Sequence, residues 1–106
     1  MAKFLISGSY TAEGAKGVLK DGGSKRRNVA KAITEKAGGK MEAMYFAFGA
    51  NDFHIIADLP DAASALAISM TIGASGAIRT QTTVLLTPEE VDAAAKKSVD
   101  YRPPGT

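Results

Sequence analysis

The sequence predicts an α+β domain of the ferredoxin-like class, with the element order β-α-β-β-α-β and a four-stranded antiparallel sheet. Four short runs are rich in β-branched and aromatic residues, and segments with helical periodicity lie before and after the middle pair of runs. Only a few residues join the two middle runs, and such short connections join antiparallel strands. No linker divides the 106 residues, so residues 1–106 are predicted to form a single domain.

The first half of the chain is predicted to contain one strand and two helices. Residues 3–10 form an apolar run followed by small side chains, which is typical of a strand. Thr11 is a suitable N-cap for a helix that ends near residue 21, and Ser24 is a suitable N-cap for a second helix over 25–37. One glycine pair separates these helices and another follows the second, as expected at helix C-termini.

The two middle strands are predicted over residues 40–48 and 53–59, joined by a turn at 49–52. Strict alternation along the first of them would place Met41 and Tyr45 on one face, opposite Glu42 and the phenylalanines. Each alternating set contains apolar side chains, so the alternation alone leaves open which face is turned toward a partner.

The second half is predicted to contain a helix, a strand, an additional C-terminal helix and an extended tail. A proline and an aspartate open the helix over 60–72, and a threonine- and valine-rich strand follows over 79–86. Thr87 is a suitable N-cap for a last helix to residue 98, with proline at its first position and Glu90 completing a capping box. Two prolines keep the tail over 101–106 extended.

Self-association is expected because two helices can cover only one face of such a sheet. Both alternating sets of the middle strands are partly apolar, and the helix over 60–72 is apolar around much of its circumference. Large uncovered apolar surfaces mark association sites, and a two-fold homodimer is their commonest outcome. We therefore expect a homodimer or a multiple of it.

Composition limits the classes of function. The absence of cysteine excludes disulfides, zinc-thiolate sites and thiol nucleophiles, and it is consistent with a cytoplasmic location. Neither a secretory signal nor an apolar run long enough to cross a membrane is expected. The glycines form no nucleotide-binding motif, and no cofactor is indicated.

Positive charge is concentrated in residues 16–40, which hold eight basic and two acidic residues, a local net charge of +6. Such a segment can attract anions or nucleic acid, or it can be a solvated helix face. Because no aromatic residues are interleaved with Lys25, Arg26 and Arg27, nucleic-acid binding is not the preferred interpretation.

His54 is the only histidine and the candidate catalytic residue, because imidazole is the side chain that exchanges protons near neutral pH. Alternation places it on one face with Asp52 and Asp58, either of which could orient it as a general base. The alternative is a hydrogen-bonded histidine at an interface. One histidine with two aspartates does not match the usual metal-ligand spacings, so no metal site is predicted.

A ligand-binding set is predicted around His54. Tyr45 can offer a phenol or anchor an interface, and Arg79 can bind a carboxylate or pair with an acidic side chain. Ser7 can add a hydroxyl from the end of the first strand, and Asp52 completes the set with His54. Phe46, Phe48 and Ile56 were expected to supply apolar walls.

The stretch over 45–53, Tyr-Phe-Ala-Phe-Gly-Ala-Asn-Asp-Phe, resembles the GYD-domain family of small bacterial proteins. The similarity covers essentially the whole chain and includes Lys20-Asp21-Gly22-Gly23 and Thr87-Pro88-Glu89-Glu90. Of the Gly-x-Tyr-Asp motif that names the family, Gly49 and Asp52 are present, but Asn51 stands at the tyrosine position. The motif is therefore interpreted partly as turn chemistry, in which the aspartate binds its own turn.

The resemblance implies a ferredoxin-like fold of the dimeric α/β-barrel type, in which two sheets pack face to face, and it implies no particular activity. We expect an oligomeric module that binds a small molecule between subunits or on the sheet face. The alternatives are a cofactor-independent enzyme, monooxygenase- or isomerase-like, that uses His54, and an anion- or nucleic-acid-binding protein that uses residues 16–40.

Overall fold

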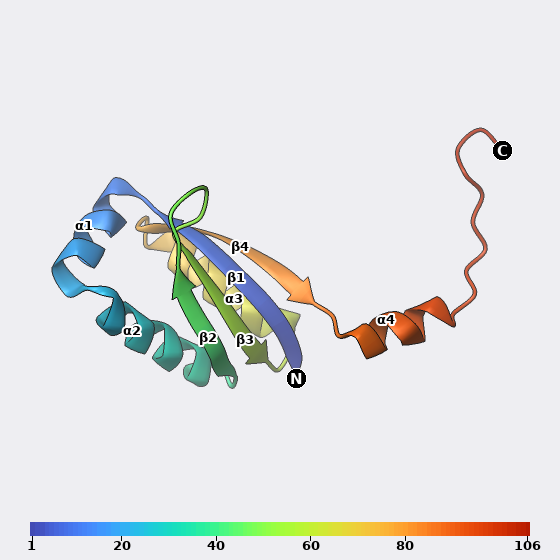
Figure 1. Cartoon of the computed structure of the whole chain (residues 1–106), viewed down its shortest axis with the longest axis horizontal. Helices are drawn as coiled ribbons and strands as arrows, with labels where there is room; N and C mark the ends of the chain where they lie inside the picture. Colours follow the sequence, from blue (N-terminus) through green and yellow to red (C-terminus); the bar gives the residue numbers. More distant parts are fainter.

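Four antiparallel strands form one sheet, and the computed structural model describes all residues from 1 to 106. The elements are β1 (Ala2–Tyr10), α1 (Ala12–Asp21), α2 (Gly23–Lys36), β2 (Lys40–Phe46), β3 (Phe53–Leu59), α3 (Ala62–Ala74), β4 (Ile78–Leu85) and α4 (Pro88–Ala95). The strand order is β2-β3-β1-β4, with every neighbouring pair antiparallel (Figure 1). The predicted α+β fold with a four-stranded antiparallel sheet is confirmed, and its topology is consistent with the ferredoxin-like class.

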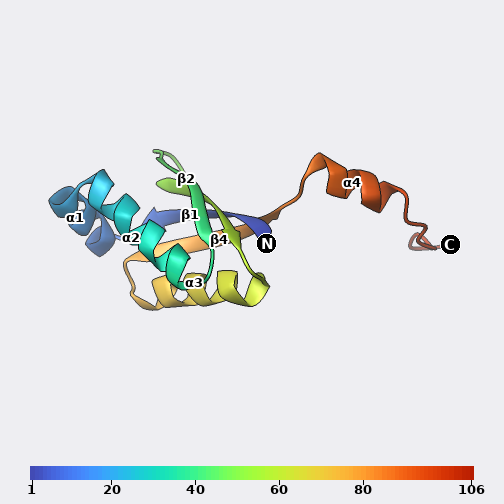
Figure 2. The same cartoon turned by 90° about the horizontal axis from the view of Figure 1, so that it is seen from below.

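The core lies between one face of the sheet and the helices. Alternate residues of β1 and β3 are buried there, among them Phe4, Ile6 and Ile55. Helix α2 packs against β2, while α3 packs against β4 and contributes Ala65 and Ile68 to the core (Figure 2). No helix of the chain covers the opposite face, called the open face below.

The junction between α1 and α2 depends on a single glycine. Gly22 adopts a φ of +79°, and its N–H donates to the carbonyl of Val18, which ends α1. The next helix begins at Gly23 without a side-chain cap, so the prediction that Ser24 caps α2 is wrong. The turn made by Gly22 allows the second helix to begin immediately, two residues earlier than a Ser24 cap would allow.

A β-bulge in β2 overturns the predicted alternation of that strand. The register with β3 shifts between Met41 and Ala43, so the extra residue is Glu42. Met41 pairs with the core residue Ala57, and Tyr45 pairs with His54 of the open face. Met41 and Tyr45 therefore lie on opposite faces, contrary to the expectation from strict alternation.

Helix α3 starts at a well-formed cap. The Asp61 carboxylate accepts hydrogen bonds from the backbone N–H and the hydroxyl of Ser64, both at 2.8 Å. These hydrogen bonds hold the pKa of the Asp61 carboxyl below its usual value of 3.8, and the bond from the backbone N–H has the larger effect. The helix has no ionisable residue between Ala62 and Ala74, and it continues two residues beyond the predicted end. No helix in the structure has the length and apolarity needed to cross a bilayer.

The chain beyond β4 extends away from the rest of the molecule. Both views show α4 and the residues after it projecting past the end of the sheet (Figures 1 and 2). The radius of gyration is 16.9 Å, against about 13 Å for a compact domain of this length. The accessible surface is 7500 Å², against about 5,600 Å² for a compact monomer of this mass. The predicted capping box is present, with Thr87 and Glu90 bonded reciprocally, but α4 ends at Ala95 and not near residue 98.

Candidate functional site

The open face carries an ordered set of side chains, because directly paired residues of antiparallel strands share a face. One row crosses all four strands and consists of Tyr45, His54, Ser7 and Gln81. The next row is mainly apolar and consists of Ala43, Ile56, Leu5 and Thr83. A charged row, centred on Lys3 and Asp58, lies at one end of the face. Arg79 lies at the other end, beyond the row that contains Ser7 and His54. The face is therefore polar at both ends and apolar between them.

His54 is held by a serine of the neighbouring strand. The Ser7 Oγ atom lies 2.7 Å from the His54 Nδ1 atom, and the two residues are directly paired between β1 and β3. Ser7 is buried although it faces away from the helices, and His54 is half-buried. The chain provides no hydrogen-bond partner for the His54 Nε2 atom, so one ring nitrogen is fixed while the other remains available.

The predicted pairing of His54 with an aspartate does not occur, because both aspartates bind other groups. The Asp58 carboxylate lies 3.3 Å from the Lys3 ammonium. Asp52 precedes β3, and its carboxylate accepts a 2.8 Å hydrogen bond from the backbone N–H of Tyr10. Its own N–H donates to the carbonyl of Gly8. The motif aspartate thus attaches its loop to the end of β1, whereas the sequence predicted that it would bind its own turn.

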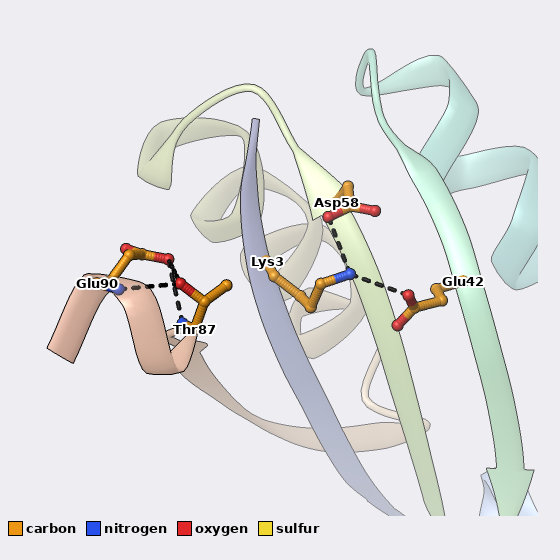
Figure 3. A network of polar contacts seen from close by, with 5 residues as sticks. All are labelled: Lys3, Glu42, Asp58, Thr87 and Glu90. Carbon is orange, nitrogen blue, oxygen red and sulfur yellow. Dashed lines mark hydrogen bonds and ion pairs between the residues drawn. The ribbon is translucent and has the colours of Figure 1, made fainter. Parts of the chain in front are cut away.

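The charged side chains at one end of the open face form ion pairs within the chain. The Lys3 ammonium bridges Glu42 at 3.0 Å and Asp58 at 3.3 Å (Figure 3). Hydrogen bonds to Glu42 first, and to Asp58 second, raise the pKa of Lys3 above its usual value of 10.5. The interactions that raise the lysine pKa stabilise the folded state at pH values below 10.5. This stabilisation is lost as the pH rises through the pKa that Lys3 has in the folded state. The Lys3 ammonium is therefore charged at neutral pH.

Arg79 is an exposed cation without an ionic partner. The three ion pairs of the chain involve Lys3 twice and Lys25 once, so the predicted alternative of an Arg79 ion pair is absent. Arg79 pairs with Ser9 across the strands, one step along from the Ser7 row. Gln81 stands directly opposite Ser7, and it was not selected from the sequence because no motif marks it.

The aromatic residues expected together are separated by the strand geometry. Tyr45 lies on the open face beside His54 and is 71% exposed. Phe46 is on the helix side, near Gly23. Phe48 lies in the loop after β2 and is fully exposed. Of the aromatic and apolar residues expected around the pocket, only Tyr45 and Ile56 therefore share the open face with His54.

The basic segment over 16–40 occupies α1 and α2. Most of its lysines and arginines are exposed, Lys25 lies 3.6 Å from the Asp21 carboxylate, and Arg26 is half-buried. Nowhere do three or more histidine and acidic side chains gather as a metal-binding group. The open face thus brings together Ser7, Tyr45 and His54, with Arg79 at its edge, whereas Asp52 is engaged with the backbone.

A family model described as GYD domain matches residues 4–95, which is most of the chain. The chain belongs to the GYD-domain family. The match begins within β1 and ends at the last residue of α4, so the family domain includes the projecting helix. Comparisons with curated proteins and with solved structures found no match.

Proposed function

We propose that this GYD-domain protein is a homodimer, or a multiple of one, whose open faces enclose a chamber that binds a small molecule beside His54. The observation that carries the proposal is the Ser7–His54 hydrogen bond. It holds an imidazole in place on a sheet face that no other part of the chain covers. Imidazoles with one fixed and one available nitrogen are suited to contacting a ligand.

The composition of the open face favours a second copy as its cover. Leu5 and Ile56 form an apolar centre that is only partly buried, and covering the apolar area they still expose stabilises a dimer by about 25 cal/mol per Å². The nearby Lys3, Glu42 and Asp58 are ion-paired with one another, and Lys40 stands opposite Asp58, so their burial costs less than that of isolated ions. A two-fold axis would place the same apolar row on both sides.

The ligand that fits these groups is a small molecule with an apolar body and a polar or anionic group. Leu5 and Ile56 would contact the body, while His54, Tyr45 and Gln81 offer hydrogen-bonding groups. Arg79 has no acidic partner in its own chain, so it is free to bind a carboxylate or phosphate group.

Native mass spectrometry of gently purified protein tests this proposal, because it reports the number of subunits and any retained molecule together. We expect a dimer, or a multiple of it, with a reproducible added mass. Replacing His54→Ala and Arg79→Gln should each lower the fraction of protein that carries the added mass. The number of subunits should stay the same, because neither side chain belongs to the chain's core and the apolar centre of Leu5 and Ile56 is unaltered.

Leu19→Ala is the matched control, because Leu19 is 88% exposed on α1 and lies away from the open face. It should retain the added mass in full. An added mass that persists unchanged in the His54 and Arg79 variants would contradict binding beside these residues.

A second candidate is a cofactor-independent enzyme in which His54 transfers a proton. The Ser7 hydroxyl favours this activity, because its hydrogen bond holds the His54 Nδ1 atom and leaves the Nε2 atom available to exchange a proton with a bound molecule. Once a retained molecule is identified, deuterium exchange at its acidic C–H bonds can be followed by NMR. Exchange that is equally fast with the His54→Ala variant would rule out this activity.

A further inference from the structure

Helix α4 is well specified by the sequence but has no partner in its own chain. Its N-terminus is closed by a complete capping box between Thr87 and Glu90 (Figure 3). None of its eight residues is buried. Isolated helices shorter than about 12–15 residues are marginal in water. An eight-residue helix that belongs to the family domain therefore needs a surface on which to pack.

The helix has a distinct apolar side. Val91, Ala94 and Ala95 are three and four residues apart and share one side, while Glu89 lies on the opposite side. The apolar character continues past the helix, where Val99 is 83% exposed and Tyr101 is 73% exposed. We call residues 86–106 the C-terminal arm.

The direction in which the arm leaves the sheet is fixed locally. A residue before proline is restricted to extended conformations, and Thr87 has φ −77° and ψ 158° before Pro88. The capping box adds two hydrogen bonds that hold this geometry. Since only Leu86 separates Thr87 from β4, the arm continues outward and does not fold back over its own strand (Figures 1 and 2).

An uncharged groove with matching chemistry lies between α3 and β4. Its volume is about 330 Å³, and Leu66 and Val84 line it together with Phe4 and Thr82. Leu66 and Val84 remain more than half exposed, and α3 carries no charge that would oppose an apolar side chain. β4 is an edge strand, so nothing in the sheet covers this side.

We propose that the C-terminal arm of each chain packs its apolar side into the α3–β4 groove of a second copy. Every copy has one arm and one groove, so reciprocal exchange leaves neither uncovered. The partner is a second copy because its groove is apolar and uncharged like the Val91 side of the arm, whereas the chain's own groove lies behind the outgoing arm. This contact uses none of the open-face residues and does not depend on a ligand.

Disulfide cross-linking tests the exchange, since the natural chain has no cysteine. The full chain carrying Leu66→Cys and Val91→Cys should form covalent dimers under mild oxidation, with residues 66 and 91 joined in the mapped peptides. Both positions are more than half exposed, so the fold should tolerate the changes. A disulfide requires Cα atoms within about 7 Å, which makes the link specific for the proposed contact.

The matched control carries Leu66→Cys and Glu89→Cys, which places the second thiol on the opposite side of α4. It should form far less of the covalent dimer. A link formed within a single chain would show that the arm folds onto its own groove and would overturn the proposal. Equal linking by the control, or no link between residues 66 and 91, would overturn it as well.

Discussion

In a chain that also carries Leu66→Arg to block the arm contact, replacing Ile56→Arg should dissociate the protein into monomers that remain folded. Ile56 is half-buried at the centre of the open face and faces away from the helices, so its own chain does not depend on it for the core. In a face-to-face dimer the arginine would be buried without a partner, which typically costs about 3–5 kcal/mol. Each such penalty lowers the dimer affinity by about two to four orders of magnitude, and a two-fold dimer buries two arginines.

Sedimentation of the variant and of the natural protein at the same concentrations measures this effect, with circular dichroism to verify the fold. Leu19→Arg is the control, because it places the same charge at an apolar residue of α1 that is already exposed. The control should sediment like the natural protein. A Leu66→Arg protein that keeps its mass when Ile56→Arg is added would show that the open face is not the interface.

Gly14→Ala should destabilise the fold, although alanine is normally the better helix former. Gly14 is buried in the first turn of α1, and an added Cβ would lie 2.1 Å from the carbonyl oxygen of Ala77. Because the obstacle is backbone, the helix must move away from the chain that enters β4. Overpacking of this kind costs about 1–3 kcal/mol.

Gly17→Ala, one turn later in the same helix, provides the comparison. No atom lies within 4 Å of its added Cβ, so the usual preference for alanine should stabilise the helix by about 0.5–1 kcal/mol. The melting temperatures of the two variants, measured at one protein concentration, should therefore shift in opposite directions, by about 4–8 °C for each kcal/mol of stability. If both variants shifted the melting temperature upward, the close packing of α1 against Ala77 would be wrong.

Regular patterning made most of the fold predictable. Alternation along β3 separates Phe53 and Ile55 from His54, and the structure keeps that separation. The Thr11 and Thr87 caps could be predicted from single residues, because a cap is a local hydrogen-bonding arrangement. The bulge at Glu42 could not be predicted from the sequence. One extra residue in a strand moves the side chains before it to the opposite face, and no residue type marks the place where it occurs.

The site was less predictable than the fold, because its contacts depend on register between distant strands. The pairing of Ser7 with His54, 47 positions apart, follows from how β1 and β3 align. The same alignment brings Lys3 to Asp58, which removes that aspartate from the histidine. Gln81 was missed because only its position opposite Ser7 distinguishes it from other polar strand residues.

The reactivity of one introduced thiol tests most directly whether a second chain covers the open face. Thr83 lies on the open face and is exposed in the single chain, so only a second chain can shield it. A Thr83→Cys variant should react with a maleimide much more slowly than an Ala32→Cys variant, whose thiol would be exposed on α2. Adding Ile56→Arg should restore fast labelling. Equal rates for the two single-cysteine variants would contradict the covered open face, and with it the proposed chamber.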